Sequence, residues 1–375
     1  MTNSNINLDD YVLPIREESK KHRKYKITSY SKIENTSMSF GSAKGIIMII
    51  PTIGCSWALS KSGGCSMCGY NNDSTLDPDT DSLKYFDLEW NKHTDQISEI
   101  EGIKIFNSGS FFDPREISYD KQEKIMTKIA SIPNIKEVAV ESRPEFIKEH
   151  KDQLRKLVTI LGDKKLYIGV GLESSNDFVL NSYINKGFKF SDYLESILIA
   201  KEVGANIKTY VFFKPPFMTE KEAIEDTVQT IKDAIIAGSK LISINPAAIH
   251  KFTLMESLYY RKQYSPPWLW SIIEILKQID SEKPADVQIM CEVMAGGKKR
   301  GAHNCGSCDV FVLQEIEYYS KNNKFSPAFE HLECEENNCD NTWNWVVSSE
   351  ELLIRNEPIF YHYQDKVNPI RKVMQ

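Results

Sequence analysis

Six short apolar segments alternate with helix-like stretches through the middle of the chain, and this alternation constrains the fold most strongly. Most of the segments are apolar nearly throughout, as strands buried on both faces of a parallel sheet are. Strands that alternate with helices predict a parallel sheet with right-handed crossovers. Six units are too few for a closed eight-stranded barrel, so we expect an α/β fold, either a partial barrel or an open doubly wound sheet. The segments are residues 45–53, 103–109, 137–142, 165–173, 206–213 and 240–247.

Two of the expected helices have residues typical of helix caps at their ends. Ser191 is placed as an N-cap before an apolar-periodic run, and Gly204 follows the end of that run. Thr219 with Glu222 three residues later has the pattern of a capping box, and Gly238 ends the helix that follows.

Polar clusters follow each of the six predicted strands. In both candidate architectures the active face lies at the carboxyl ends of the strands. A purely structural protein does not require this coincidence, so the sequence predicts a functional site at that edge. The clusters begin at residues 54, 107, 141, 171, 214 and 245.

Three cysteines, Cys55, Cys65 and Cys68, lie on the loop after the first predicted strand, in the spacing C-x9-C-x2-C. Structural zinc normally takes four protein ligands, and a four-iron cluster is usually held by four thiolates. A cluster held by three cysteines leaves one iron open to a small molecule such as S-adenosylmethionine (SAM). Half of a zinc site completed by distant cysteines, and redox or inert thiols, are the alternatives.

A second cysteine-rich region begins near Gln288. Two short-range cysteine pairs joined by a spacer are typical of zinc sites. The preferred ligands are Cys305, Cys308, Cys334 and Cys339, with Cys291 and His303 as alternative ligands, or with some of the cysteines as buried free thiols. We therefore divide the chain into a polar leader (1–40), a barrel domain (41–287) and a cysteine-rich region (288–375).

Composition limits the class of protein. The 375 residues suffice for one large α/β domain and a small appendage. No apolar run approaches the ~20 residues of a membrane span, so no membrane association is expected. The N-terminus is polar, acidic and without an apolar signal core, which favours a cytoplasmic protein.

The net charge of −6 gives no general affinity for nucleic acid, so local positive charge must supply it. Two basic runs occur. One adjoins the C-terminal cysteines and contains Lys298, Lys299 and Arg300, a setting that suits phosphate contacts. The other consists of Lys20, Lys21, Arg23 and Lys24.

Over roughly residues 40–345 the motifs together resemble the archaeosine-forming radical SAM family of tRNA-modifying enzymes, relatives of the Elongator catalytic subunit. The loop is longer than the C-x3-C-x2-C that is commonest in the superfamily, and Met67 stands where an aromatic residue is usual. The motifs are GCSWALSKSGGCSMCGYNND, GSFFDPRE, VESRPEFI, VGLESSNDFVLNSYINKGF, KPPFMTEKEAI, SINPAAIHKFTLMESLYYRKQYSPPWLWS and KRGAHNCGSCD.

The resemblance implies a partial (β/α)6 barrel with a [4Fe-4S] cluster on Cys55, Cys65 and Cys68. SAM would bind the fourth iron and, given one electron by a donor, would yield a 5′-deoxyadenosyl radical. The implied substrate is tRNA that carries a lysine-modified 7-cyano-7-deazaguanine at position 15, and cleavage of the lysine C–N bond would leave archaeosine. A partner enzyme would install the lysine, and the cysteine-rich region 288–375 would bind the tRNA. No catalytic acid or base is assigned.

Further residues are candidates for binding SAM or substrate. In the superfamily, the position of Asn107, Ser108, Gly109 and Ser110 serves the SAM amine, although an ordinary βα turn remains the alternative. Arg143 suits the SAM carboxylate, or a salt bridge with Glu141 or Glu173. Glu173 is placed against a ribose hydroxyl or the amine, and Lys214 against a substrate phosphate or a barrel carboxylate.

Two rival functions stay open at this point. One is a radical SAM enzyme that acts on another RNA site or on a small molecule. The other is a non-catalytic RNA-binding protein whose cysteines all hold structural zinc.

Overall fold

The computed structural model describes residues 7–22 and 28–356. Arg23 and Lys24 of the N-terminal basic run lie outside the described residues, as do residues 357–375 of the expected tRNA-binding region. No helix in the described part of the chain is long and apolar enough to cross a membrane.

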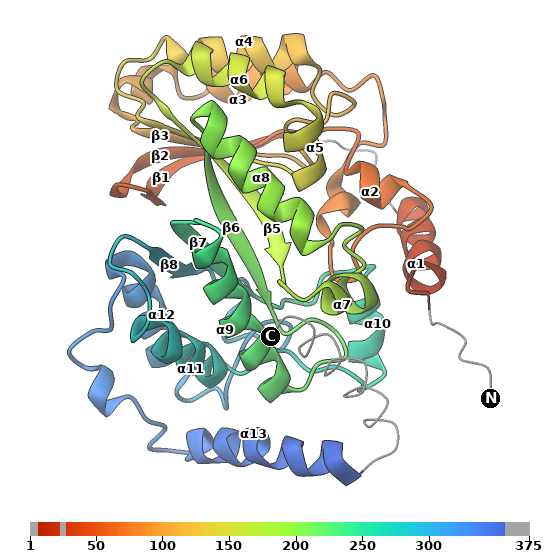
Figure 1. Cartoon of the computed structure of the whole chain (residues 1–375), viewed down its shortest axis with the longest axis vertical. Helices are drawn as coiled ribbons and strands as arrows, with labels where there is room; N and C mark the ends of the chain where they lie inside the picture. The colour runs from red at the N-terminus through yellow and green to blue at the C-terminus, as the bar shows by residue number, and fades with distance from the viewer. Residues whose placement is uncertain (1–6, 23–27, 357–375) are drawn as a thin grey trace.

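One curved eight-stranded sheet organises the molecule, with its strands in chain order from β1 to β8 (Figure 1). β1 pairs with β2 antiparallel, and every later neighbour pair is parallel. β1 and β8 are the two edges, so the sheet is a partial barrel and not a closed one. The strands are β1 Tyr30–Met38, β2 Gly41–Ile49, β3 Gly102–Phe106, β4 Glu137–Glu141, β5 Lys165–Glu173, β6 Asn206–Phe213, β7 Leu241–Pro246 and β8 Gln288–Cys291.

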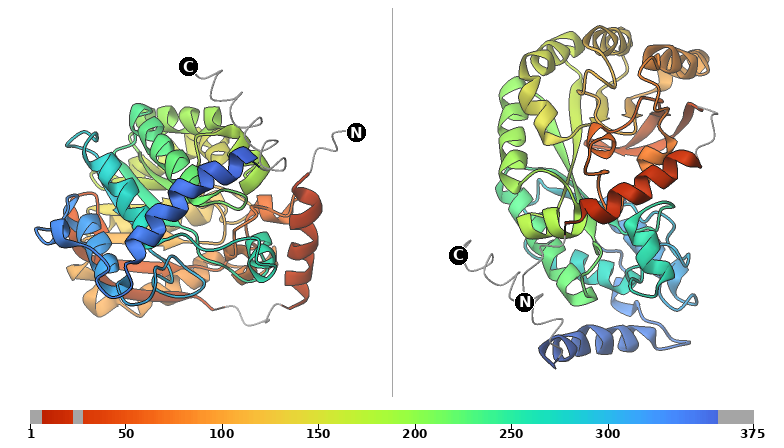
Figure 2. Two further views of the ribbon diagram at one scale, coloured as in Figure 1. Left: turned by 90° about the horizontal axis from the view of Figure 1, so that it is seen from below. Right: turned by 90° about the vertical axis from the view of Figure 1, so that its right-hand side faces the viewer.

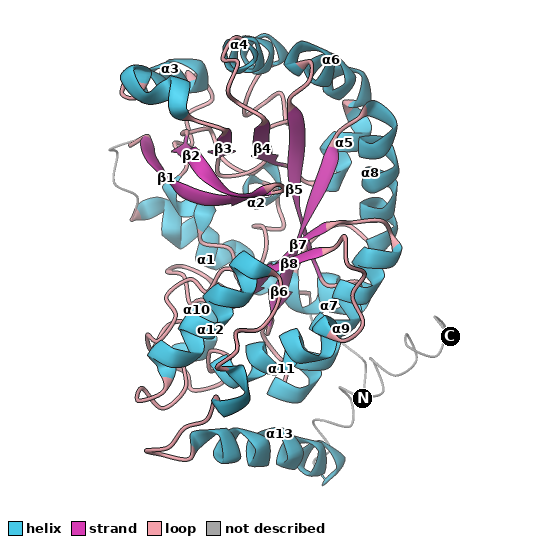
Figure 3. Ribbon diagram, turned by 90° about the vertical axis from the view of Figure 1, so that its left-hand side faces the viewer, coloured by secondary structure: helices cyan, strands magenta, loops and turns pink. Residues whose placement is uncertain are grey.

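Helices form an arc along the outer side of the curved sheet (Figure 3). Fully buried aliphatic side chains such as Ile103, Ile105 and Ile168 fill the core between the sheet and these helices. The helices of the arc are α3 Ser82–Asn91, α4 Tyr119–Ala130, α5 Pro144–Glu149, α6 Lys151–Leu161, α8 Phe190–Val203, α9 Glu220–Ile236, α11 Leu269–Asp280 and α12 Asp309–Asn322.

Four further helices lie near the carboxyl ends of the strands, on the right-hand side of Figure 1. They are α1 Asp9–Lys21, α2 Ser56–Leu59, α7 Asp177–Val179 and α10 Leu254–Tyr260. The last helix, α13 Cys339–Asn356, lies across the opposite part of the molecule from α3, α4 and α6 (Figure 2). Single turns of other helix types lie at η1 Tyr70–Asp73, η2 Thr94–Glu99, η3 Leu180–Ile184 and η4 Phe329–His331.

The six predicted strands are β2 to β7. The predicted bounds 165–173 and 206–213 match β5 and β6, whereas β2 begins and ends earlier than the predicted 45–53. The structure adds β1 and β8 at the edges. This arrangement confirms the α/β class and selects the partial barrel over the doubly wound sheet.

Helix ends agree with the sequence at three of four marked positions. Thr219 and Glu222 form the expected capping box of α9, and Gly204 ends α8 at φ +86°. Gly238 follows α9 at φ +103°. The N-cap prediction at Ser191 is wrong, because α8 begins one residue earlier. The Asp192 carboxylate there accepts the backbone N–H of Lys189 at 2.8 Å, which sets the first turn.

Candidate active site and metal centre

Cys55, Cys65 and Cys68 lie together on the loop that follows β2. Burial raises the pKa of each thiol, and each is raised further by another member of the trio. Three cations oppose this: Arg143 lowers the pKa of Cys55 and Cys65, Arg16 lowers that of Cys68, and Lys186 lowers that of Cys65 and Cys68. The pKa of each thiol stays above its usual value, and the cations limit that rise.

The cysteine loop packs tightly against the turn after β3. A side-chain carbon at Gly109 would lie 2.7 Å from Cα of Cys55 and 2.0 Å from Oε1 of Glu116, so only glycine fits there. Gly54 precedes the first cysteine at φ +111°, a backbone conformation that glycine adopts without strain. The backbone amide of Cys55 donates to Oδ1 of Asn71 at 3.1 Å. The loop is therefore held in one shape by its neighbours.

Helix α1 fastens the same loop through Arg16, which is 2 % exposed. Its guanidinium donates to the carbonyl oxygens of Gly63 and Cys68 and to Oδ1 of Asn72, each at 3.0 Å. Sequence analysis missed Arg16, because nothing in a polar, charged N-terminal segment distinguishes a buried arginine from solvated ones.

Three of the four expected SAM-binding residues after β3, namely Asn107, Gly109 and Ser110, lie against the carboxyl group of Glu116. Glu116 accepts the backbone N–H of Ser110 at 2.7 Å, the Asn107 amide at 2.8 Å and the Thr52 hydroxyl at 2.7 Å. Burial raises the pKa of Glu116 to about 7. Oδ1 of Asn107 is buried and has no hydrogen-bond partner among the described residues. Ser108 is partly exposed beside them.

Glu116 was also missed as a functional residue, although it stands inside the GSFFDPRE motif. The one available signal was a carboxyl group nine residues after Asn107, just beyond the polar cluster that follows the second predicted strand.

Arg143 lies at the start of α5, buried between two aromatic rings. Its guanidinium carbon is 5.4 Å from the ring centroid of Trp57 and 5.3 Å from that of Phe188. Of the salt bridges considered from sequence, neither forms: Arg143 pairs with Glu145, and it donates to the carbonyl oxygen of Lys186 at 2.8 Å. Glu145 stands two residues away on the same turn and is therefore within easier reach than either strand residue.

Glu173 is the last residue of β5 and Lys214 is the first residue after β6, and both lie in the left-handed region, at φ +66° and +67°. Such backbone is costly for residues other than glycine and clusters at functional sites. The Glu173 carboxylate is 2.7 Å from Nζ of Lys186, and Nζ of Lys214 is 2.5 Å from the carboxylate of Glu220. Of the two partners expected for Lys214, the structure provides the barrel carboxylate.

The basic loop before the C-terminal cysteines contains two exposed lysines and one arginine that forms an ion pair. Lys298 and Lys299 are exposed. Arg300 is partly buried, pairs with Glu256 at 2.7 Å and donates to the hydroxyl of Tyr260 at 3.1 Å. The two lysines are therefore the members of this run that remain available to phosphate.

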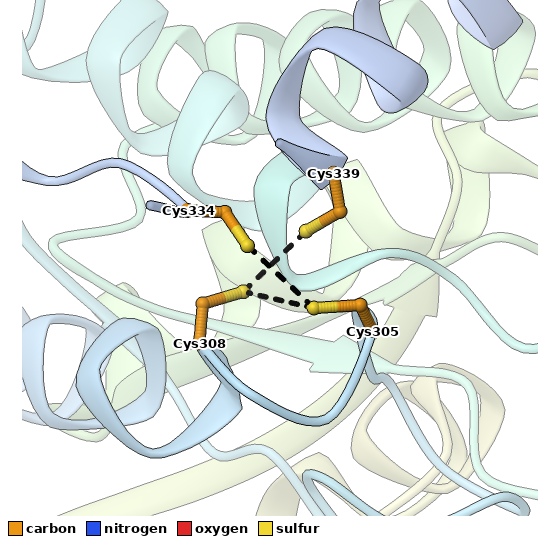
Figure 4. Close-up of side chains that lie close together, drawn as sticks. All are labelled: Cys305, Cys308, Cys334 and Cys339. Atoms are coloured by element: carbon orange, nitrogen blue, oxygen red, sulfur yellow. Dashed lines mark hydrogen bonds between the residues drawn. The ribbon is translucent and has the colours of Figure 1, made fainter. Parts of the chain in front are cut away.

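Four cysteines converge in the C-terminal region, and their sulfurs point toward one another (Figure 4). Neighbouring sulfurs are 3.5 to 4.0 Å apart. A tetrahedral ion with metal–sulfur bonds of about 2.3 Å has sulfur–sulfur edges of roughly 3.8 Å, so this group has the dimensions of a single-ion site. The members are Cys305, Cys308, Cys334 and Cys339.

Side chains around this group donate N–H bonds to three of its sulfurs. Asn304 and Asn337 approach the sulfurs of Cys308 and Cys305 at 3.4 Å, and the Trp270 indole approaches Cys339 at 3.2 Å. Donors of this kind stabilise thiolates and orient metal ligands. The alternative ligands lie elsewhere: Cys291 is on β8 and His303 bonds the Gly301 carbonyl oxygen.

The two cysteine sets differ in their dimensions. Among the described residues, only the C-terminal set places all its ligand atoms within 4.8 Å of one another. One ion needs that closeness. A four-iron cube binds each thiolate to a separate iron and keeps the sulfurs further apart. The C-terminal set therefore has the closeness that a single ion needs, and the trio after β2 does not.

An α/β partial barrel whose first parallel strand leads into a three-cysteine loop is the arrangement that the resemblance to the radical SAM family predicts. Archaeosine synthase subunit beta of Methanosarcina acetivorans is 35 % identical to this chain over 312 residues, which cover 82 % of the chain and 86 % of that protein. The chain belongs to the family of archaeosine synthase beta subunits.

Further relatives agree with this assignment. A protein of the same name from Thermococcus kodakarensis is 32 % identical over 331 residues, 86 % of this chain and 97 % of that protein. An uncharacterized protein of Methanocaldococcus jannaschii is 36 % identical over 93 % of this chain and 96 % of its own length. No family model matches the chain.

Among solved structures, the archaeal Methanocaldococcus infernus Elp3 covers 64 % of this chain and 59 % of its own, at 15 % identity and a TM-score of 0.47. The family assignment therefore rests on the sequence relatives.

Proposed function

We propose that this protein is the radical SAM lyase that completes archaeosine in tRNA. It would cleave the C–N bond between a lysine side chain and the modified base at position 15, leaving the amidine of archaeosine. The observation that carries the proposal is the trio Cys55, Cys65 and Cys68 at the carboxyl edge of the parallel sheet. Membership of the archaeosine synthase beta family supports the choice of substrate.

The residues at this edge fit an iron–sulfur cluster with SAM. Three thiols rather than four leave one coordination position open, and Arg143 and Lys186 supply the positive charge that a thiolate-bound cluster favours. The unpartnered Oδ1 of Asn107 is an acceptor suited to an ammonium group. When bound, the cluster and SAM supply a carbon radical that removes a hydrogen atom beside the linking nitrogen of the substrate.

The chain's own residues hold and orient the reactants. We propose that Asn107, Ser108, Gly109 and Ser110 receive the SAM amine and that Arg143 receives its carboxylate, since a guanidinium matches a carboxylate. Glu173, fixed by Lys186, would accept a ribose hydroxyl. These roles leave the buried Glu116 as the group that keeps the Asn107–Ser110 turn in place.

The C-terminal region would bind the tRNA. We propose that Cys305, Cys308, Cys334 and Cys339 hold zinc, which shapes the loop that presents Lys298 and Lys299 to phosphates. Arg300 would hold that loop on α10 through Glu256. Lys214 would reach a phosphate only by leaving Glu220. The partners of the reaction are then tRNA, the enzyme that adds the lysine, and an electron donor.

The test uses lysine-modified tRNA, SAM and a reductant under anaerobic conditions, followed by mass spectrometry of the nucleosides. Wild-type protein should form archaeosine and 5′-deoxyadenosine in step. Cys55→Ala, Cys65→Ala and Cys68→Ala should each lose both products and most of the iron, because each thiolate holds one iron. Cys291→Ala, a buried cysteine outside both centres, is the matched control and should keep its iron. Full iron retention in the triple cysteine variant would overturn the cluster assignment.

A further inference from the structure

Two lysines project from the inner face of the sheet, away from the covering helices. Side chains alternate along a strand, and the neighbours Ile103, Ile105 and Ile207 belong to the core beneath the helices. Lys104 on β3 and Lys208 on β6 therefore face the hollow side of the partial barrel. They are 8 % and 9 % exposed.

β4 and β5 lie between the two lysines, and the residue directly in register with each lysine is small. Lys104 is in register with Ala139 of β4, and Lys208 with Gly169 of β5. A side-chain carbon at Gly169 would lie 2.8 Å from the Tyr210 ring, so the missing side chain leaves room for that ring. The two lysines therefore stand on either side of β4 and β5. Lys104 reaches Thr36 of β1, and Lys208 lies over the Tyr210 ring at 5.1 Å from its centroid.

Both ammonium groups lack a close anionic partner. Lys104 donates to the Thr36 hydroxyl at 2.7 Å and forms no ion pair with any residue that the structure describes. Lys208 has the carboxylate of Glu292 at 3.8 Å, longer than a direct hydrogen bond. Burial, and next the charge of Lys208, lower the pKa of Lys104 to about 8. Burying charges without partners is costly, so this pair favours an anionic ligand.

Carboxyl groups lie beside the lysines on the same face. Glu141 ends β4 and bonds the Tyr210 hydroxyl. Burial, with smaller contributions from the charges of Glu292 and Glu173, raises the pKa of Glu141 to about 7, although the Tyr210 hydroxyl and the charge of Lys208 oppose the rise. Acidic groups that repel one another favour a cation placed between them.

This inner face leads along β5 from Gly169 to Gly171, where a side-chain carbon would lie 2.8 Å from Nζ of Lys186. The carbonyl oxygen of Asn185, next to Lys186, accepts the indole N–H of Trp57 from the cysteine loop at 2.7 Å. The carboxyl end of the inner face therefore adjoins the cysteine loop. A ligand held on the inner face would lie next to the proposed cluster.

We propose that this inner face is a subsite for an α-amino acid group, with the carboxylate between Lys104 and Lys208 and the ammonium beside Glu141 and Glu292. The assignment of the amino acid as the lysine of the modified base rests on the proposed function. The subsite would then hold the far end of the lysine, while the bond to be cleaved points toward the cysteine loop.

The probe is Nε-acetimidoyl-L-lysine, which carries the amino acid group and an amidine at the linking nitrogen. Its partner probe, N-(5-aminopentyl)acetamidine, lacks only the carboxylate. Isothermal titration calorimetry on the full-length protein should show tighter binding of the first. Lys104→Met and Lys208→Met should each weaken the first probe about tenfold or more and leave the second unchanged. Glu141→Gln and Glu292→Gln should weaken both probes.

Lys283→Met is the matched control, because Lys283 has an equally buried side chain that is already paired with Asp280. It should bind both probes as the wild type does. Thermal unfolding of each variant separates lost binding from lost folding. Equal loss of both probes in the lysine variants, or no loss in either, would overturn the subsite. So would loss of inorganic phosphate binding with the amino acid probe unaffected, since the lysines would then serve a phosphate.

The two proposals fail separately. If wild-type protein forms archaeosine and the lysine variants do not discriminate between the probes, the subsite is wrong and the proposed function stands. If the variants discriminate as expected and no archaeosine forms, the subsite stands and the proposed function is wrong.

Discussion

Arg16 on helix α1 donates a hydrogen bond to the carbonyl oxygen of Cys68, 3.0 Å away and 52 residues along the chain. The bond joins an N-terminal helix to the third cysteine of the loop that we propose to hold iron. Because two further acceptors, Gly63 and Asn72, share the same guanidinium, α1 determines the shape of that loop.

Arg16→Ala should therefore impair cluster assembly without removing a ligand. It leaves three acceptors without their donor, at a cost of about 3 kcal/mol in unfolding free energy. Iron content after anaerobic reconstitution should fall well below that of the wild type. Arg155→Ala, which removes an exposed arginine with only surface ion pairs, should leave iron content unchanged. Wild-type iron content in Arg16→Ala would show that α1 does not shape the loop.

Glu116 gives a pH dependence whose sign follows from its burial. Its pKa rises from 4.5 to about 7 in the folded protein. The folded state then holds a proton that the unfolded state releases, so stability falls as pH rises from about 4.5 to about 7 and is level above that. In Glu116→Gln this component should vanish. Urea unfolding of the metal-free protein should be measured at pH 5 and pH 8. The free energy of unfolding of the variant, relative to that of the wild type, should be higher at pH 8 than at pH 5. An equal difference at both pH values would contradict the assignment.

The interior of the fold could be predicted because its strands are apolar and continuous. The segment that became β5, residues 165–173, matches its predicted bounds for this reason. β1 was missed because it is an antiparallel edge strand with mostly polar, half-exposed side chains, and β8 because four residues are too short for a periodic signal. Hydrophobic pattern reports burial, and edge strands have little of it.

The candidate site could be predicted only where spacing carries chemistry. Cys305, Cys308, Cys334 and Cys339 were grouped correctly, because short-range pairs must close on one ion. The ion-pair partners of Arg143 and Lys214 could not be predicted from the sequence, since an ion pair depends on which carboxylate the tertiary fold brings near. Lys104 and Lys208 gave no signal at all. A lysine within an apolar strand becomes significant only once the register shows which face it occupies.

The C-terminal centre should be separable from the cluster by mutation. Cys308→Ser should release the bound metal and loosen α13, because a structural ion supplies folding free energy directly and Cys339 begins that helix. Metal analysis should show zinc lost and iron retained, and limited proteolysis should cut between α12 and α13. Cys291→Ala should keep its zinc. If the iron content of Cys308→Ser falls below that of the wild type, and the wild type holds no zinc, this centre is a second iron–sulfur cluster.

The exposed lysines before that centre should carry part of the tRNA affinity. Lys298→Gln combined with Lys299→Gln removes two cations that make no ion pair with described residues, so folding should be unaffected. Each lost phosphate contact lowers the log–log salt slope of binding by about 0.7 to 0.9, so the pair should lower it by about 1.5. Fluorescence anisotropy of labelled tRNA at several salt concentrations measures this slope. Lys20→Gln with Lys21→Gln is the control, because these lysines already pair with Glu17 and Glu18 on α1. If the control lowers the slope and the 298–299 variant does not, the tRNA lies on α1, and the C-terminal loop has only a structural role.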